Sequence, residues 1–192
     1  MFRNKTILVT GGTGTIGRSA VKLFLEKDAR EIRVFSRDEE KQFVMKSQIN
    51  DSRITYYLGD VRNADSIVRA MVGVDYVLHT AALKQVPILE RFPMEALKTN
   101  IEGTNNLLDV AITLGIKKVI CTSSDKAVYP VNAMGLSKAF MEKLICSKAV
   151  AHNNGTTIAC LRLGNILGSR GSVVPTFISQ AVAGEPLTVT EP

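Results

Sequence analysis

Short runs of apolar, often β-branched residues alternate with longer amphipathic stretches along most of the chain. Parallel strands need long crossover connections, usually helices, so this alternation predicts an α/β fold, a doubly wound parallel sheet. Apolar runs such as Ile7-Leu8-Val9 and Val119-Ile120-Cys121 fit strands buried on both faces. The six expected strands are Lys5–Thr10, Glu31–Phe35, Ile54–Leu58, Tyr76–His79, Lys118–Ser123 and Thr157–Leu163.

Helical periodicity fills most of the gaps between these strands. The expected helices are Ile16–Lys27, Ala64–Val72, Met94–Leu114 with a possible break, Ala133–Ala151 and Pro175–Ala183. Leu187–Thr190 has the pattern of one more strand, yet the chain stops at Pro192 with nothing to pair with it. We therefore expect that a C-terminal portion is missing.

Composition narrows the class of protein. With 192 residues, 45% hydrophobic and 22% charged, the chain is long enough for one domain with a sizeable core. No apolar run approaches the roughly 20 residues that span a bilayer, and no signal peptide precedes the first strand. The three cysteines form no CxxC pair, which fits a reducing compartment. The net charge of +6 is dispersed without a basic tract. We expect a cytoplasmic protein that binds neither membrane nor nucleic acid.

The first expected strand is followed by Gly11-Gly12-Thr13-Gly14-Thr15-Ile16-Gly17, in which Gly11, Gly14 and Gly17 have the spacing GxxGxxG at the start of the first expected helix. Gly11 permits a tight turn, Gly14 lets a pyrophosphate approach the backbone, and Gly17 allows close packing of helix on strand. The amides at the helix N-terminus, from Thr13 through Ile16, face the anion. This loop predicts a dinucleotide-binding site.

The end of the second strand selects the cofactor, because an acidic residue there would bind the ribose 2′-hydroxyl of NAD. Here Ser36 and Arg37 occupy that place, with Asp38 one position later. A hydroxyl and a guanidinium suit a 2′-phosphate, so the sequence favours NADP.

Two further segments belong to the expected cofactor site. Asp60 and Val61 follow the third strand, where they would meet the adenine, although Asp60 is equally suited to cap the helix that begins near Ala64. Ala81 and Ala82 follow the fourth strand, and their small side chains would let the dinucleotide pass close to the sheet edge.

The two histidines suggest no metal site. No Cys or His cluster accompanies His79, so we expect it to lie in the core. His152 falls near a helix end and is interpreted as a structural or capping residue. We expect no metal ion.

Reactive side chains follow the fifth strand at Ser124-Asp125-Lys126, and Met134 and Lys138 share one face of the next helix. With the glycine loop, this layout resembles the extended short-chain dehydrogenase/reductases, which carry Tyr-x-x-x-Lys on that helix. Met134 stands at the tyrosine position.

Four segments make the resemblance more specific: Ala81–Pro87, Lys98–Thr104, Ser124–Gly135, and Gly164-Asn165 with Ser169–Ser172. Together they resemble the inverting UDP-N-acetylglucosamine 4,6-dehydratases of capsule, O-antigen and flagellin-sugar biosynthesis, in the branch with methionine for tyrosine. The resemblance implies NADP as cofactor, a UDP-sugar such as UDP-N-acetylglucosamine as substrate, and a homo-oligomer, with a hexamer as one form of the full-length protein.

The same resemblance implies the roles of the reactive residues. Lys126 is the base at sugar C5, Asp125 is the acid at the C6 hydroxyl if its site is partly desolvated, and Lys138 binds the nicotinamide ribose. Burial and the charge of Lys138 would lower the pKa of Lys126. Met134 cannot carry the C4 hydroxyl proton. Either Lys126 or a water relayed through Ser124 takes that proton.

The substrate side is expected from four other residues. Lys84 follows the fourth strand, and a plain surface role is an equal alternative. Asn165 follows the sixth strand, and Arg170 and Ser172 are placed to meet the UDP diphosphate. We expect residues 1–192 to form an NADP-binding Rossmann domain, with the substrate-binding portion starting near residue 164 and its remainder absent.

Two other functions are alternatives to the dehydratase. A UDP-sugar 4- or 5-epimerase shares the oxidation at C4, but the ordinary 4-epimerase relies on the tyrosine that Met134 replaces. A non-catalytic NADP(H)-binding protein or fragment is the alternative from a different class.

Overall fold

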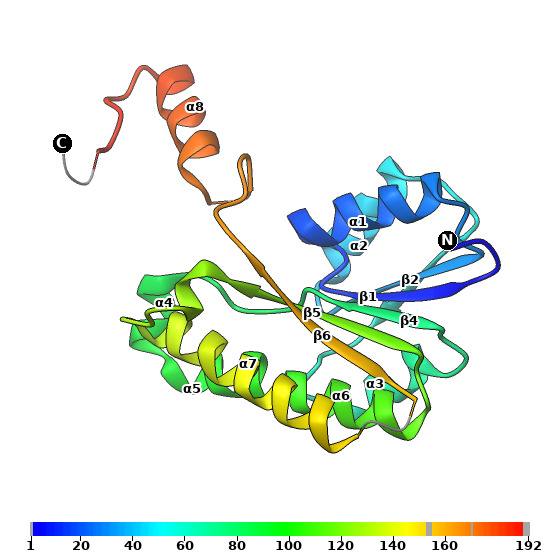
Figure 1. The fold of residues 1–192 in the computed structure, drawn as a ribbon. Helices are drawn as coiled ribbons and strands as arrows, with labels where there is room; N and C mark the ends of the chain where they lie inside the picture. The colour runs from blue at the N-terminus through cyan, green and yellow to red at the C-terminus, as the bar shows by residue number, and fades with distance from the viewer. Residues whose placement is uncertain (1, 153–154, 170, 190–192) are drawn as a thin grey trace. The chain divides into compact units, whose positions relative to one another are not determined.

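The computed structural model describes residues 2–152, 155–169 and 171–189 (Figure 1). The chain forms two compact units, residues 1–162 and 163–192. No helix in the described part of the chain is both long and apolar enough to cross a membrane.

The first unit is built on a six-stranded sheet with the order β3-β2-β1-β4-β5-β6. Four neighbouring pairs are parallel, and Val9 of β1, for example, lies between Val34 of β2 and Leu78 of β4. The predicted doubly wound parallel sheet is therefore confirmed. The strands are β1 (Thr6–Thr10), β2 (Glu31–Ser36), β3 (Ile54–Leu58), β4 (Tyr76–His79), β5 (Lys118–Ser124) and β6 (Thr157–Leu163).

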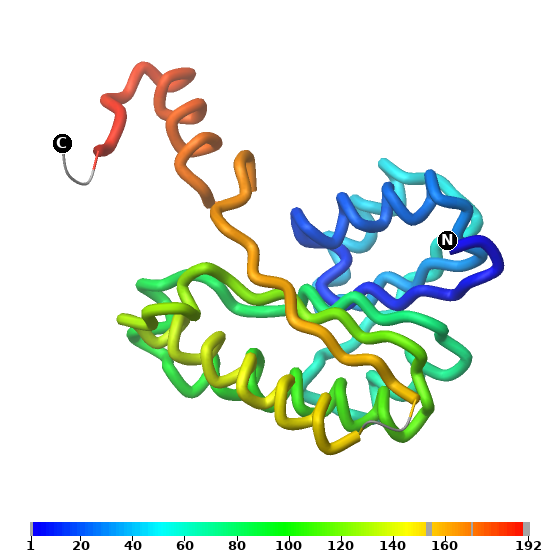
Figure 2. The backbone as a smooth tube through the Cα atoms, in the orientation of Figure 1, coloured from blue at the N-terminus to red at the C-terminus, as the bar shows by residue number. Residues whose placement is uncertain are grey.

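Helices cover both faces of this sheet (Figures 1 and 2). Those on one face are α1 (Thr15–Glu26) and α2 (Glu39–Gln48), and those on the other include α3 (Ala64–Met71), α6 (Gly103–Thr113) and α7 (Ala133–Ala151). The short elements are α4 (Val86–Arg91), α5 (Pro93–Ala96), the π-helical turn η1 (Leu97–Glu102) and the 3-10 turn η2 (Asp125–Ala127).

Successive residues of β1 enter two different cores. Ile7 and Val9 pack with α1 and α2, whereas Leu8 packs with α3, α6 and α7. This confirms that Ile7-Leu8-Val9 is buried on both faces. The same expectation is wrong for Ile120 of β5, which is 41% exposed, because α7 packs on the opposite face of that strand.

The order of the strands changes direction at β1. The chain runs outward from β1 through β2 to β3, then crosses back to place β4 on the other side of β1. The loops after β1 and β4 therefore turn toward opposite faces, which is the topological switch point where open α/β sheets bind ligands.

Two helices, α2 and α4, were not predicted from the sequence. The sequence of α2 is weakly amphipathic, since it buries only Gln42 and Met45, and α4 has only six residues. Short or weakly patterned helices give little periodic signal. The stretch Met94–Leu114 is indeed interrupted, because η1 separates α5 from α6.

The second unit contains α8 (Val173–Ala183), which begins two residues before the expected helix and ends at Gly184, a left-handed glycine cap. Leu187–Val189 does not form the expected strand, and Thr190 lies outside the described residues. A strand needs a neighbour for its backbone hydrogen bonds, and the apolar pattern alone does not supply one.

Candidate active site

The loop between β1 and α1 leaves no room for side chains at two of its motif glycines. Gly11 has a φ of +65°, and a Cβ there would lie 2.7 Å from the backbone nitrogen of Ala81. A Cβ on Gly17 would lie 2.4 Å from the carbonyl oxygen of Gly11. The expected tight turn is present at Gly11, and at Gly17 the helix packs closely against the turn that follows β1.

The first turn of α1 suits an anion. Gly14 is the N-cap and provides no side-chain acceptor, so the cap leaves backbone N–H groups of that turn for another partner. Thr15 is exposed and Ile16 is half-buried at the start of the helix. This bare helix end beside a glycine turn fits the phosphates of a dinucleotide.

The end of β2 joins the glycine loop through two hydroxyls. The Oγ1 atom of Thr13 and the Oγ atom of Ser36 are 3.0 Å apart, and both residues are buried. Asp38 is occupied as the N-cap of α2, where its carboxylate accepts from a backbone N–H. The side chain of Arg37 is 50% exposed, with Nη1 3.7 Å from Asp60 Oδ2. The exposed charge beside Ser36 is thus a guanidinium.

Asp60 does not cap the next helix. Asn63 does so, by accepting a 3.0 Å hydrogen bond from the backbone N–H of Ser66. The carboxylate of Asp60 accepts instead from Arg62 Nε at 3.0 Å. Partial burial raises the pKa of Asp60, but the hydrogen bonds and charge of Arg62 outweigh it and lower that pKa below its ordinary value. Val61 is buried in the core. The capping alternative is therefore wrong.

The segment after β4 is tied to the end of β1. Thr80 Oγ1 donates to the carbonyl oxygen of Thr10 at 2.7 Å, and the backbone N–H of Ala81 lies 3.5 Å from Thr10 Oγ1. Ala81 and Ala82 are half-buried, and Lys84 is exposed. The small side chains allow the close approach of the glycine loop.

His79 lies in the core, as expected. Its Nδ1 is 2.6 Å from Thr10 Oγ1 and its Nε2 is 3.0 Å from Thr104 Oγ1, so both ring nitrogens have partners. Burial, with a smaller contribution from the charge of Lys138, lowers the pKa of His79 to about 3. The ring is neutral at physiological pH.

The other histidine lies at the end of a helix. His152 is the C-cap of α7, which confirms its capping role. Within residues 2–152, 155–169 and 171–189, no group of three or more His, Cys, Asp or Glu side chains has an arrangement that could hold a metal ion.

Met134 and Lys138 share the buried face of α7. Met134 packs in a small cluster with Leu89 and Ala96. Lys138 is 6% exposed, and its Nζ donates to the carbonyl oxygen of Thr122 at 3.0 Å. Burial lowers the pKa of Lys138 to about 8. The shared face predicted from the four-residue spacing is confirmed.

Asp125 and Lys126 differ from the expectation of a desolvated pair. Their side chains are 53% and 40% exposed, and Lys126 Nζ lies 3.2 Å from Asp125 Oδ1. Ser124 Oγ donates to the same carboxylate at 2.8 Å. Hydrogen bonds from Ser124 and Lys126 lower the pKa of Asp125, so its carboxyl is not kept protonated by burial. The partial desolvation that the acid role of Asp125 requires is therefore not provided by the described residues, because solvent and donors surround the carboxylate.

The expected substrate residues of the second unit occupy different elements. Asn165 lies between β6 and α8, and Ser172 is the N-cap of α8. The Oγ atom of Ser172 is buried and has no hydrogen-bond partner. Arg170 lies outside the described residues.

One buried polar residue had no role in the sequence analysis. The side chain of Asn100 in η1 bonds to the backbone of Leu83 and to the hydroxyl of Ser137. Its residue type was the available signal, because an asparagine inside an apolar helical stretch needs partners if it is buried.

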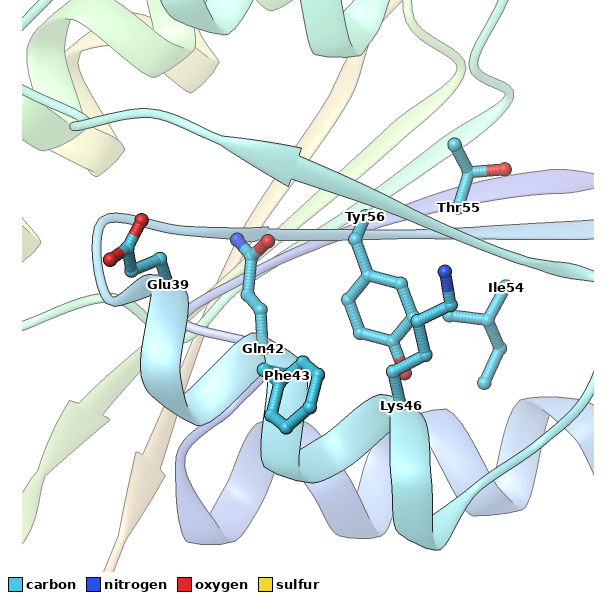
Figure 3. Close-up of a pocket in the computed structure, with 7 residues that line it drawn as sticks. All are labelled: Glu39, Gln42, Phe43, Lys46, Ile54, Thr55 and Tyr56. Atoms are coloured by element: carbon cyan, nitrogen blue, oxygen red, sulfur yellow. The ribbon is translucent and has the colours of Figure 1, made fainter.

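A groove of about 400 Å³ lies apart from these residues, between α2 and the edge strand β3 (Figure 3). No expected catalytic or cofactor residue lines it. Its lining residues are Glu39, Gln42, Phe43, Lys46, Ile54, Thr55 and Tyr56.

A family described as polysaccharide biosynthesis protein matches residues 7–192. A Rickettsia prowazekii (strain Madrid E) protein named UDP-glucose 4-epimerase is 54% identical over 197 residues, which cover 100% of this chain and 58% of the relative. Its Rickettsia rickettsii (strain Sheila Smith) counterpart, with the same name, is 53% identical with the same coverage. The chain thus spans 58% of the length of these curated relatives.

Solved structures show the same fold. The X-ray structure of Pen from Bacillus thuringiensis matches with a TM-score of 0.96 and 42% identity, over 100% of this chain and 60% of that one. DesIV, a dTDP-glucose 4,6-dehydratase from Streptomyces venezuelae solved with NAD and TYD bound, matches with a TM-score of 0.84 and 23% identity, over 95% and 63%. The second likeness is one of fold alone. Because the family match extends over nearly all of its residues, the chain belongs to the polysaccharide biosynthesis protein family.

Proposed function

We propose that the full-length protein is an NADP-dependent UDP-N-acetylglucosamine 4,6-dehydratase that inverts C5, in bacterial surface polysaccharide biosynthesis. The observation that carries this proposal is the buried pair of Met134 and Lys138 on α7, next to the reactive residues after β5. A thioether neither donates nor accepts a proton as a phenol does. Proton transfer therefore passes to Lys126 and its neighbours.

The cofactor assignment rests on the glycine loop and on the end of β2. The loop of Gly11, Gly14 and Gly17 offers backbone donors and close approach to a pyrophosphate. Arg37 offers an exposed guanidinium that can meet a 2′-phosphate with two hydrogen bonds. The NAD in the DesIV structure is the cofactor found with that protein. When bound, the nicotinamide supplies reversible hydride transfer, first from sugar C4 and finally to C6.

Lys126 and Asp125 carry the elimination in this proposal. Oxidation at C4 makes the C5 proton acidic, so Lys126 takes that proton while Asp125 protonates the departing C6 hydroxyl. Both side chains are exposed and paired with each other in the structure. A bound sugar would exclude water from the pair, which raises the pKa of a carboxyl and lowers that of an amine. The C4 hydroxyl proton passes to a water relayed through Ser124 and on to solvent, or it passes to Lys126, which releases it to solvent before it takes the C5 proton.

Lys138 has a supporting role. Its pKa of about 8 leaves the ammonium mostly protonated at neutral pH, where it binds the nicotinamide ribose and adds positive charge beside Lys126. Lys84, Asn165, Arg170 and Ser172 are proposed for the UDP-sugar side of the site.

Mass spectrometry of the product tests this function directly. The full-length protein is incubated with UDP-N-acetylglucosamine and NADP, and loss of one water from the nucleotide sugar is the expected result. Proton NMR of the product then reports the configuration at C5. An unchanged mass would refute the dehydratase proposal.

The relatives named UDP-glucose 4-epimerase favour a second candidate. An epimerase would leave the mass of the sugar unchanged and would change the C4 configuration. Met134 weighs against this candidate, because the ordinary 4-epimerase uses a tyrosine at this position to move the C4 hydroxyl proton. The same incubation separates the two functions.

A further inference from the structure

The strand β3 forms an open edge of the sheet. It is the first strand in the order β3-β2-β1-β4-β5-β6, so in the described part of the chain only β2 pairs with it. An open edge offers backbone N–H and C=O groups to another strand, and proteins commonly protect it with a lysine, a proline or a bulge. The sequence of β3, ITYYL, contains neither lysine nor proline, and its register with β2 is continuous. A further strand can therefore pair with this edge.

The backbone of β3 determines which groups face its open side. The carbonyl of Arg53 and the N–H of Gly59 both bond to β2. Successive residues of a strand turn their backbone groups to opposite sides. The N–H and carbonyl of Tyr56 and of Leu58, and the carbonyl of Ile54, therefore point away from β2.

A second copy of β3 in the antiparallel direction matches these groups. With a two-fold axis at Tyr56, this residue faces the partner's Tyr56, and the two exchange both N–H···O bonds. The N–H of Leu58 then meets the carbonyl of the partner's Ile54. The side chains match as well, because Leu58, which is 58% exposed, lies opposite the partner's Ile54 on the face of the sheet that α2 covers. The edge is thus complementary to itself.

The groove between α2 and β3 adds an apolar surface beside this edge (Figure 3). Phe43 of α2 lines the groove together with Ile54 and Tyr56, and 75% of its surface is exposed. Phe43 also lines a neighbouring groove of about 300 Å³. Aromatic side chains are enriched in the central part of protein interfaces. Phe43 is therefore suited to contact another protein surface.

The charges on α2 follow the same two-fold symmetry. Glu39 and Lys46 line the groove seven residues apart, about 10 Å along the helix (Figure 3). Both are exposed, and among the described residues neither has an ion-pair partner. Because α2 connects two parallel strands, it runs opposite to β3, with Glu39 toward the Leu58 end and Lys46 toward the Ile54 end. A two-fold axis at Tyr56 places Glu39 near the partner's Lys46, and Lys46 near the partner's Glu39.

We propose that the face formed by β3 and α2 binds a second copy of this chain. The two β3 strands pair in the antiparallel direction across a two-fold axis at Tyr56, and the two α2 helices lie side by side with Phe43 near the partner's Phe43. The sheet then continues from one copy into the other. The contact is isologous, so each interaction away from the axis occurs twice. This inference does not depend on the proposed function.

Reversal of the two charges tests the symmetry in the full-length protein. Glu39→Lys or Lys46→Glu alone places like charges opposite each other at two related points, so the dissociation constant of the two copies, measured by sedimentation velocity, should rise at least about 10-fold. The double variant restores opposite charges and should restore the association. Glu40→Lys is the matched control and should associate as the wild type, because Glu40 is exposed in the same first turn of α2 but does not line the groove.

Cross-linking locates the contact even if the full-length protein also associates through other surfaces. Phe43→Cys is combined with Cys146→Ser, which removes the exposed native thiol, and is oxidised with copper phenanthroline. We expect a disulfide-linked pair of chains, because residue 43 lies near the axis. Glu26→Cys in the same background is the control, since Glu26 is exposed at the end of the neighbouring helix α1 and should not cross-link.

Hydrogen exchange at the amides of Tyr56 and Leu58 reports whether the edge is covered. In the wild type we expect slow exchange at concentrations at which the copies associate. Because the protecting bonds come from the partner, we expect exchange at least about 10-fold faster after dilution and in Glu39→Lys.

Three results would overturn the inference. In the first, the amides of Tyr56 and Leu58 exchange fast at every concentration, so nothing covers the edge. In the second, they exchange slowly at every concentration and equally slowly in Glu39→Lys, so another part of the full-length chain or a different bound molecule covers the edge. In the third, the double charge variant associates as weakly as the single variants, or Phe43→Cys cross-links no more than the control.

Discussion

Replacing His79 should make the protein less sensitive to mild acid. The ring is fully buried between Thr10 and Thr104, and burial lowers its pKa from 6.5 to about 3. A base with a depressed pKa in the folded state leaves stability intact above its unfolded pKa. As pH falls below 6.5, the unfolded chain binds a proton that the folded chain does not, so the free energy of unfolding decreases.

The size of this effect follows from the two pKa values. Between pH 7.5 and pH 5, proton binding to the unfolded state lowers the free energy of unfolding by about 2 kcal/mol. At pH 6 the loss is about 0.8 kcal/mol. Carboxyl groups titrate mostly below this window, because their unfolded pKa values are near 4. The window from pH 7.5 to 5 therefore isolates the histidine.

Urea denaturation at pH 7.5, 6 and 5 measures this dependence. His79→Gln loses stability at every pH because the bonds to Thr10 and Thr104 change, but it should lack the additional loss of about 2 kcal/mol at pH 5. The chain has only one other histidine, and the control His152→Gln should keep the wild-type dependence, since His152 is exposed. The reasoning fails if His79→Gln and the wild type lose the same stability between pH 7.5 and 5.

Three other changes test the site. Arg37→Asp should remove the preference for NADP over NAD at a cost of about 1.5–3 kcal/mol, measured by calorimetric titration, and equal binding of both cofactors by the wild type would contradict the assignment. Lys126→Ala should abolish dehydration and solvent deuterium exchange at C5 while NADP binding stays intact. The control Lys143→Ala, at an exposed lysine, should keep dehydration and exchange. Normal deuterium exchange in Lys126→Ala would exclude Lys126 as the base. Gly17→Ala should lower the free energy of unfolding, measured by urea denaturation, by about 1–3 kcal/mol and should weaken dinucleotide binding, because its Cβ would lie 2.4 Å from a backbone oxygen. The control Gly164→Ala has open space around its Cβ and should behave as the wild type.

The sequence by itself determined the architecture. The patterns that predicted it are local. Apolar runs predict strands, the glycine sequence predicts a tight turn, and the four-residue spacing of Met134 and Lys138 predicts a shared helix face, because backbone geometry fixes each of these. All six expected strands differ from the observed ones by at most one residue at each end, and Ile54–Leu58, Tyr76–His79 and Thr157–Leu163 match at both ends. The parallel order then places the glycine loop at the switch point.

Only the tertiary structure decided the electrostatics and the polar contacts of the site. Asp125 and Lys126 were expected to be desolvated, but burial depends on which distant segments cover a loop, and here solvent reaches both. Asn100 gave no periodic signal, because its partners Leu83 and Ser137 are 17 and 37 residues away. Hydrogen bonds and pKa values depend on atoms brought together by packing, and a local sequence pattern does not contain those distances.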